Sequence, residues 1–391
     1  MSNGKERAYF QIPPGMKDWL PGEAEKKRRL ENVLADLFSV WGYREVITPA
    51  IEYLEVLTAG HNQEEMMYKF FDHQGRALAL RPDMTTPIAR LAATRLKQEP
   101  LPLRLFYLAG VFGQEDPQKG RQREYHQAGV ELIGSGSGAA VAEVLALAVE
   151  ALRACGLKEF TLSAGHVGVF NGLVDWLGLP PEARQELREA VQARNFVAVE
   201  LILNRYAGSQ KEAALTILRL RGGREILPRL KELAAGEAME ATVAELEEIF
   251  SFLAGYGVED YITLDLGLLR GLGYYTGLVF EGFSPALGYP ILGGGSYGHL
   301  LGRFGWPQPA VGFALGLERV LLALEREQPR RSGEGKIVYV GYAPGREKEA
   351  IALALRLREE GKRTVLAVAA EEKAVAEEQA RRRRGELVYL G

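Results

Sequence analysis

Apolar residues recur along the chain with two different periods. A spacing of three to four positions runs from Leu30 to Trp41 and through residues 139–154 and 180–255, which predicts amphipathic helices. Shorter apolar runs bounded by glycine, proline and polar turn residues predict strands. These runs are 46–49 continued by 52–56, 67–71, 77–80, 103–112, 125–133, 158–163, 261–266, 273–282, 289–292 before a cluster of three glycines, and the start of 311–320.

The order of these elements predicts how the chain is divided. Two pairs of runs, 67–71 with 77–80 and 103–112 with 125–133, predict antiparallel hairpins, and Thr85 or Thr86 can cap a helix that continues to Leu96. A strand, helix, strand, helix, strand series after residue 335 predicts a small α/β domain. The predicted divisions are a core in two parts, 1–170 and 259–327, a helical insertion at 171–258 and a terminal domain at 335–391.

Composition excludes several classes of protein. The chain has 391 residues, 47% of them hydrophobic, and its 48 basic and 51 acidic residues leave a net charge of −3, so no overall field attracts a polyanion such as tRNA. The single cysteine, Cys155, and five histidines without ligand spacing predict neither a disulfide framework nor a metal site. No apolar run approaches the roughly 20 residues of a membrane span, and no signal-peptide core is seen. We expect a cytoplasmic protein without a cofactor.

A few polar residues are placed where they could bind an amino acid. Asp83 lies between a predicted strand and a predicted helix, where it could accept hydrogen bonds from an ammonium group or simply cap the helix. Arg270 could hold a carboxylate with two hydrogen bonds or form a structural ion pair. Glu131 and Tyr275 suit an imidazole, although a tyrosine on a strand is also ordinary core or rim. The residues alone leave these alternatives open.

Four segments in order resemble histidyl-tRNA synthetase over about residues 10–325. They are LRPDMT at 80–85, EDPQKGR at 115–121 with YHQ at 125–127 and Glu131, LRGLGYYTG at 269–277, and GFALGLER at 312–319. The resemblance implies an α+β fold of the class II synthetase type, an antiparallel sheet flanked by helices. It also implies a homodimer formed through the first helix and the strand that contains Pro49.

The resemblance assigns roles to particular residues. It implies Asp83, Thr85 and Gln127 near an amino group, Arg121 and Arg270 near a carboxylate, and Glu131, Tyr274 and Tyr275 toward an imidazole. Arg319 of the last segment is then a possible residual nucleotide contact, or a helix-start residue paired with Glu318 or a neighbour.

The departures from the synthetase pattern concern catalysis. Gly113 stands where the synthetase family has the arginine of its ATP α-phosphate contact, and losing one such donor costs about 3 to 4 kcal/mol of transition-state stabilisation. Asp83 replaces a glutamate, Gly273 an aspartate, and Ser296 and Gly298 an arginine and an aspartate. The terminal domain begins like an anticodon-binding domain but reaches only its third strand, and the arginines at 381–384 suit a solvated helix end better than RNA. We therefore do not expect tRNA as a partner.

The version of the pocket motif at 81–85 also resembles the regulatory subunit of ATP phosphoribosyltransferase, a paralogue of the synthetase. This resemblance implies a protein that does no chemistry itself. Such a subunit joins short-form catalytic subunits, activates them and confers feedback inhibition by histidine in the first step of histidine biosynthesis. Histidine would bind in the synthetase-like pocket or at the contact with the partner. A working histidyl-tRNA synthetase and a scaffold that does not bind histidine are the alternatives.

Overall fold

The computed structural model describes residues 10–60, 64–114, 122–269, 275–327 and 337–391. The chain divides into two compact units, Met1–Glu327 and Gln328–Gly391, and each is considered by itself.

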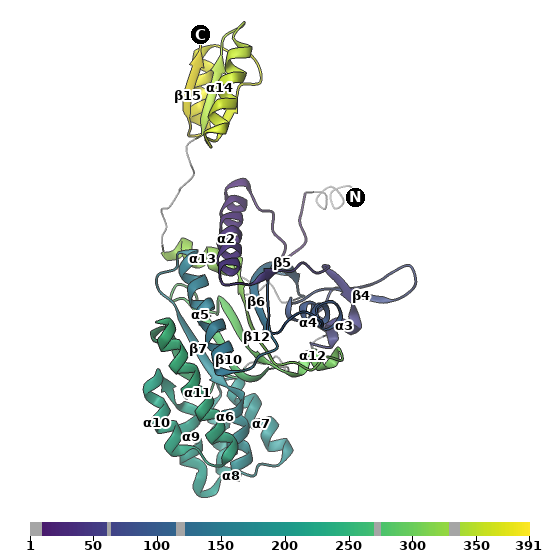
Figure 1. Ribbon diagram of the computed structural model, residues 1–391, viewed down its shortest axis with the longest axis vertical. Helices are drawn as coiled ribbons and strands as arrows, with labels where there is room; N and C mark the ends of the chain where they lie inside the picture. The colour runs from purple at the N-terminus through teal and green to yellow at the C-terminus, as the bar shows by residue number, and fades with distance from the viewer. Residues whose placement is uncertain (1–9, 61–63, 115–121, 270–274, 328–336) are drawn as a thin grey trace, which may run out of the picture. The chain divides into compact units, whose positions relative to one another are not determined.

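The first unit is built on a large, mostly antiparallel sheet (Figure 1). Its nine strands within the described chain are, in spatial order, β1 (Arg44–Glu45), β5 (Leu103–Phe112), β6 (Glu124–Ile133), β12 (Ala310–Gly316), β11 (Leu292–Tyr297), β10 (Tyr275–Phe283), β7 (Thr161–His166), β9 (Ile262–Asp265) and β8 (Arg221–Gly222). Neighbours from β5 to β7 all pair antiparallel, whereas β1 with β5 and β7 with β9 pair parallel.

Helices cover both faces of this sheet. One face carries α2 (Pro21–Val40), α5 (Gly138–Cys155), α11 (Glu237–Tyr256) and α13 (Leu317–Glu327), and the other carries α4 (Thr85–Arg95) and α12 (His299–Arg303). The remaining helices are α3 (Leu54–Thr58), α6 (Val167–Trp176), α7 (Pro181–Gln192), α8 (Phe196–Tyr206), α9 (Lys211–Arg219), α10 (Leu227–Leu233) and the short η1 (Glu64–Met66), η2 (Gly208–Gln210), η3 (Arg224–Ile226) and η4 (Glu259–Tyr261). The predicted antiparallel sheet flanked by helices is confirmed.

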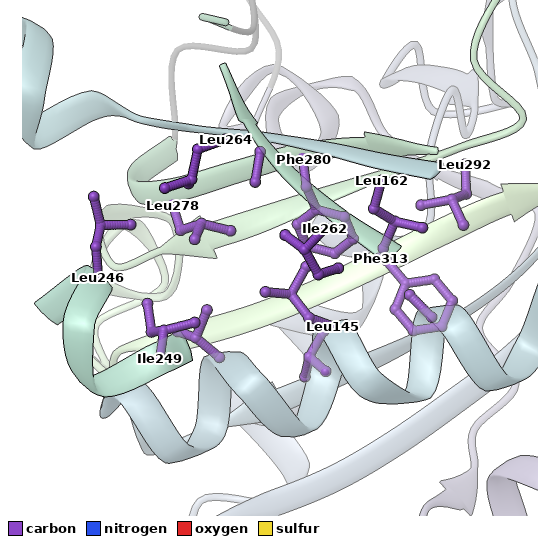
Figure 2. Close-up of a cluster of buried hydrophobic side chains, with 14 of the residues drawn as sticks. Leu145, Leu162, Leu246, Ile249, Ile262, Leu264, Leu278, Phe280, Leu292 and Phe313 are labelled. Carbon is purple, nitrogen blue, oxygen red and sulfur yellow. The ribbon is translucent and has the colours of Figure 1, made fainter. Parts of the chain in front are cut away.

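Alternation along β6 separates the two faces. Ala128, Val130 and Leu132 are fully buried in the larger hydrophobic core, where α5 and α11 pack on the strands (Figure 2). Because neighbouring residues of a strand point to opposite faces, Gln127 and Glu131 are directed to the other face, beside α4. The polar side chains that the sequence singles out on this strand therefore lie away from the main core.

A small second sheet lies in the same unit. It contains β2 (Ile51–Tyr53), β4 (Ala77–Leu80) and β3 (Lys69–Phe71), with both pairs antiparallel. The register places Ile51, Tyr53 and Phe70 on one face, and they are 45%, 43% and 37% exposed. We call these three residues the apolar face. The opposite face packs Ala79 against Leu57 and Met67.

The second unit is a separate α/β structure. Its three strands form a parallel sheet in the order β14 (Thr364–Leu366), β13 (Val338–Tyr342), β15 (Glu386–Leu390), with helices α14 (Glu347–Glu359) and α15 (Lys373–Arg382) between them. The predicted strand and helix series is confirmed. The arginines at 381–384 end α15, where Arg381 and Arg382 pair with Glu378.

Several predicted elements differ from the structure. The strand expected at 52–56 ends at Tyr53, because α3 turns Leu57 into the small core beneath β4. The segment 46–49 is not in a strand, and β7 begins at Thr161 rather than 158. The glycine cluster expected after a strand lies inside β11. A Cβ added at Gly294 would be only 2.3 Å from the backbone oxygen of Gly312 on the neighbouring strand. Sheet packing therefore requires glycine there.

Cys155 is buried in α5, and burial raises the pKa of its thiol to about 12, so the sulfur stays protonated. Among the helices of the described segments, none is both long and apolar enough to cross a membrane.

Candidate functional site

A small cavity of about 80 Å³ opens on the α4 side of the large sheet. Its polar walls come from α4 and the segment before it, and from β5, β6, β10 and β11. Its lining residues are Asp83, Thr85, Tyr107, Gln127, Glu131, Tyr275, Gly293, Gly294, Gly295, Tyr297, Gly312, Phe313 and Ala314. We call this cavity the ligand pocket.

Glu131 lies deep in the ligand pocket and is only 1% exposed. The Thr85 hydroxyl donates a 2.8 Å hydrogen bond to its Oε1, and the Tyr297 hydroxyl donates a 2.6 Å hydrogen bond to its Oε2. Each carboxyl oxygen is therefore held by one hydroxyl, from α4 on one side and β11 on the other. This fixes the plane of the carboxyl group and keeps it available to a ligand.

Burial dominates the electrostatics of the ligand pocket. Burial raises the pKa of Glu131 to about 8, against the hydrogen bonds from Tyr297 and Thr85, and the charge of Asp83 raises it further. Burial also holds the pKa of Tyr107 well above its usual value, with smaller effects from the same two acids. The described lining residues include no lysine or arginine. At neutral pH the Glu131 carboxyl is therefore mostly protonated, so it can donate one hydrogen bond as well as accept others.

Asp83 has two roles in the structure. Its Oδ1 accepts a 2.8 Å hydrogen bond from the backbone N–H of Thr86, so it caps α4 while it also lines the ligand pocket. The prediction that Thr85 or Thr86 caps this helix is wrong, because Asp83 satisfies the free N–H group and the Thr85 hydroxyl points to Glu131 instead.

The ligand pocket contains an acceptor without a described partner and a glycine that makes space for a carboxyl group. Oε1 of Gln127 is buried and has no hydrogen-bond partner in the described part of the chain, and an unpaired buried oxygen is costly unless a ligand or water reaches it. At Gly312, a Cβ would lie 2.0 Å from Oε2 of Glu131. The glycine therefore allows the carboxyl to occupy its place.

Comparison with known proteins identifies the family. A model of the histidyl-tRNA synthetase family matches residues 15–320. The chain is 50% identical to the ATP phosphoribosyltransferase regulatory subunit of Desulforamulus reducens, over 92% of this chain and 90% of that protein, and 46% identical to the one of Moorella thermoacetica, over 91% and 92%. The chain belongs to the family of ATP phosphoribosyltransferase regulatory subunits.

Solved structures place this regulatory-subunit family beside the synthetases. A crystal structure from Bacillus halodurans, described as an ATP phosphoribosyltransferase regulatory subunit/histidyl-tRNA synthetase, has a TM-score of 0.86 at 34% identity and covers 98% of both chains. The histidyl-tRNA synthetase of S. aureus has a TM-score of 0.70 at 26% identity over 97% of this chain and 91% of that one. The class II synthetase-like fold is confirmed.

The structure brings five of the expected pocket residues together. Asp83, Thr85, Gln127, Glu131 and Tyr275 all line the ligand pocket. Three others singled out in the sequence, Arg121, Arg270 and Tyr274, lie outside the described residues, as does Gly273.

Arg319 lies outside the ligand pocket. Its Nη1 donates a 2.7 Å hydrogen bond to the backbone oxygen of Pro290, and its guanidinium lies over the Tyr289 ring. Glu318, the expected ion-pair partner, accepts hydrogen bonds from the backbone N–H and Nδ1 of His126 instead. Arg319 lines a separate cavity of about 180 Å³.

Two positions where this regulatory-subunit chain departs from the synthetase pattern lie in the described segments close to strands. The N–H of Gly113 donates to the backbone oxygen of Arg123 at 2.9 Å. The Ser296 hydroxyl is buried without a hydrogen-bond partner in the described segments. Among those segments, no group of three or more histidine, cysteine, aspartate or glutamate residues is arranged to hold a metal.

Two tyrosines of the site were missed by reasoning from the sequence. Tyr107 pairs with Gly129 across the β5–β6 hairpin, and a Cβ at Gly129 would lie 2.4 Å from the Tyr107 hydroxyl. The sequence does contain a signal for Tyr107. Gln127, Gly129 and Glu131 lie on one face of their strand, and the glycine opposite the tyrosine makes room for its ring. Tyr297 follows the glycine cluster, but its contact with Glu131 spans 166 residues of sequence and has no local pattern.

Proposed function

We propose that this chain is a non-catalytic regulatory subunit that binds histidine in the ligand pocket and conveys the histidine level to a phosphoribosyltransferase. The catalytic partner is a short-form ATP phosphoribosyltransferase subunit, which the chain joins and activates. Bound histidine inhibits the complex and so gives feedback control of the first step of histidine biosynthesis. The proposal includes no cofactor and no tRNA.

The chemistry of the ligand pocket supports histidine as the ligand. Its imidazole can exchange hydrogen bonds with Glu131, which Thr85 and Tyr297 hold in place. Its ammonium group can donate to Asp83 and to the unpaired Oε1 of Gln127. In this proposal the carboxylate of histidine is bound by Arg121 and Arg270.

The observation that carries the proposal is the contrast between this pocket and its surroundings. Polar groups for an amino acid are retained around Glu131, whereas Gly113 provides no charge for an ATP phosphate. A synthetase without that donor would lose roughly a hundredfold to a thousandfold in rate. Relatives at 46–50% identity are named as regulatory subunits of ATP phosphoribosyltransferase, which supports the catalytic partner.

A homodimer is part of the proposal. The apolar face at Ile51, Tyr53 and Phe70 exposes large side chains in a row, and exposed apolar groups of this kind mark association surfaces. Ile47, four residues before β2, is also exposed, at 86%. The proposed dimer buries this region between two copies of the chain.

Reconstitution with a catalytic subunit tests the proposed function. The chain is mixed with a short-form ATP phosphoribosyltransferase subunit, and phosphoribosyl transfer is measured with and without L-histidine. We expect stimulation by the chain and inhibition by histidine. Stimulation without histidine sensitivity would favour a scaffold, and histidine-dependent exchange of pyrophosphate into ATP by the chain alone would favour a synthetase.

A further inference from the structure

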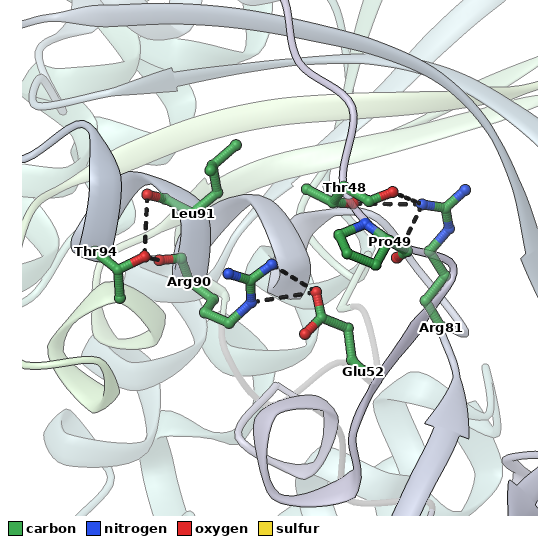
Figure 3. Close-up of polar contacts among 7 residues, drawn as sticks. All are labelled: Thr48, Pro49, Glu52, Arg81, Arg90, Leu91 and Thr94. Atoms are coloured by element: carbon green, nitrogen blue, oxygen red, sulfur yellow. Dashed lines mark hydrogen bonds and ion pairs between the residues drawn. The ribbon is translucent and has the colours of Figure 1, made fainter.

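Two arginines on one segment contact the part of the chain that contains Thr48, Pro49 and Glu52 (Figure 3). Arg81 directly follows β4, and Arg90 lies in the middle of α4. Asp83 and Thr85, which line the ligand pocket, lie between them in the sequence. Both arginines bind the stretch 48–52, which leads into β2.

Arg81 holds three backbone oxygens from two different parts of the chain. Its Nε donates to Gly110 at 2.9 Å, and its Nη1 donates to Thr48 at 2.8 Å and to Pro49 at 3.2 Å. The side chain is 7% exposed, and burial lowers its pKa. A buried guanidinium that spans β5 and the stretch before β2 fixes their separation, because its donors have a rigid fork geometry.

Backbone hydrogen bonds strengthen the same junction. The N–H of Arg81 donates to Ala50 at 3.0 Å, and its carbonyl accepts from the N–H of Phe112 at 2.9 Å. Arg81 is therefore bound through both its backbone and its side chain to the two segments beside it. Asp83 of the ligand pocket follows this junction by two residues.

Arg90 forms the second connection. Its Nη2 and Nε lie 2.6 Å and 3.2 Å from Oε1 of Glu52, and the Glu52 side chain is 7% exposed. Glu52 lies between Ile51 and Tyr53 on β2 and points to the opposite side of the strand from them. Arg90 itself is 24% exposed, but opening the pair would leave the buried Glu52 carboxylate without its partner, which favours the observed position of α4 against β2.

We propose that Arg81 and Arg90 are positioning residues that couple the ligand pocket to the apolar face. Ligand binding restricts the motion of Asp83 and Thr85, and with them of the segment 81–90. Through their contacts, the two arginines then restrict the motion of the stretch 47–53. The inference rests on the proposed function for the identity of the ligand, histidine. By linkage, association at the apolar face and histidine binding then affect each other by the same factor.

Hydrogen exchange on the full chain tests the coupling. Backbone exchange of peptides covering 47–53 is measured by mass spectrometry with and without saturating L-histidine, and calorimetry measures histidine binding on the same samples. In the wild type we expect exchange in this stretch to slow at least about fivefold, the lower end of typical coupling between sites. With Arg90→Lys, which keeps the charge but loses the two-nitrogen contact, we expect histidine still to bind and this protection to be lost.

Matched variants separate coupling from general destabilisation. Glu52→Gln opens the same pair from the other side and should give the same loss of protection. Arg104→Lys is the control, because Arg104 makes a comparable two-nitrogen contact with Glu143 at 2.8 and 2.7 Å between β5 and α5, and it should leave the protection intact. The inference is overturned, and the proposed function is not, if protection persists in both Arg90→Lys and Glu52→Gln. The same holds if the wild type binds histidine without gaining protection. Absence of histidine binding by calorimetry overturns the proposed function with it.

Discussion

The hydroxyl of Tyr297 lies 2.6 Å from Oε2 of Glu131, at the floor of the ligand pocket. Tyr297 is 2% exposed and Glu131 is 1% exposed, so this hydrogen bond is shielded from water and ties β11 to β6. It sets the orientation of the one buried carboxyl group among the described lining residues, which the proposal assigns to the imidazole of histidine.

Removing this hydrogen bond should weaken histidine binding with little effect on the fold. Tyr297→Phe keeps the ring and deletes the hydroxyl, which should cost about 1 to 2 kcal/mol, or roughly a fivefold to thirtyfold rise in Kd. Thr85→Val removes the second hydroxyl and should act in the same direction. Calorimetry measures both, with Thr216→Val as the control, since the Thr216 hydroxyl contacts only the backbone of its own helix among the described residues. Unchanged histidine affinity in both pocket variants would mean that the two hydrogen bonds to Glu131 do not contribute to ligand binding.

Glu131 should also make stability depend on pH. Burial holds its folded-state pKa at about 8, above the value of 4.5 expected without burial, so the folded chain retains this proton more tightly than the unfolded chain. The stabilising effect is complete below pH 4.5 and is lost as the pH rises to 8, by an amount on the order of a few kcal/mol. Glu131→Gln should flatten this part of the curve, measured as the free energy of unfolding without ligand. An equal slope in both proteins between pH 4.5 and 8 would mean that Glu131 is not the responsible group.

Gly312 should tolerate no side chain. A Cβ there would lie 2.0 Å from Oε2 of Glu131, so Gly312→Ala must displace the carboxyl from its two hydroxyl partners, and overpacking of this kind costs about 1 to 3 kcal/mol. We expect histidine affinity to fall at least about tenfold. Gly255→Ala is the control, because its added Cβ meets nothing within 4 Å in α11. If calorimetry gives Gly312→Ala the wild-type affinity, the geometry proposed for the pocket is wrong.

The apolar face should control self-association. Ile51→Glu places a charge among Ile51, Tyr53 and Phe70 and should raise the dimer dissociation constant at least about tenfold, because an unpaired charge is costly to bury. Sedimentation velocity over a range of concentrations measures this. Val197→Glu is the control, since Val197 is apolar and 73% exposed on α8. Equal behaviour of the two variants would place the dimer contact elsewhere.

Periodicity predicted most of the fold because each strand or helix carries its own pattern. The β5–β6 hairpin and the strand and helix series of the second unit follow from local spacing alone. The errors fall where long-range packing decides. Residues 54–58 become helical to bury Leu57 against Met67 and Ala79, and the glycine cluster joins β11 because β10 and β12 pack on both its sides.

The site was predictable to a similar degree. Asp83, Thr85, Gln127, Glu131 and Tyr275 could be selected from a motif pattern and lie around one cavity. Capping of α4 by Asp83 was one of the two alternatives that the sequence offered, and the structure bears it out. The contact of Tyr297 with Glu131 depends on which strands become neighbours across the sheet, and no local spacing predicts it.

The histidine response of a reconstituted complex tests the central claim most directly. Short-form catalytic subunit is combined with the wild-type chain or with Tyr297→Phe, and phosphoribosyl transfer is measured as L-histidine is increased. We predict equal stimulation by both chains, inhibition of the wild-type complex, and a roughly fivefold to thirtyfold higher histidine requirement for the variant, from the loss of one buried hydrogen bond. Equal inhibition of the two complexes would contradict binding in this pocket, and failure of the wild-type chain to stimulate would contradict the regulatory role itself.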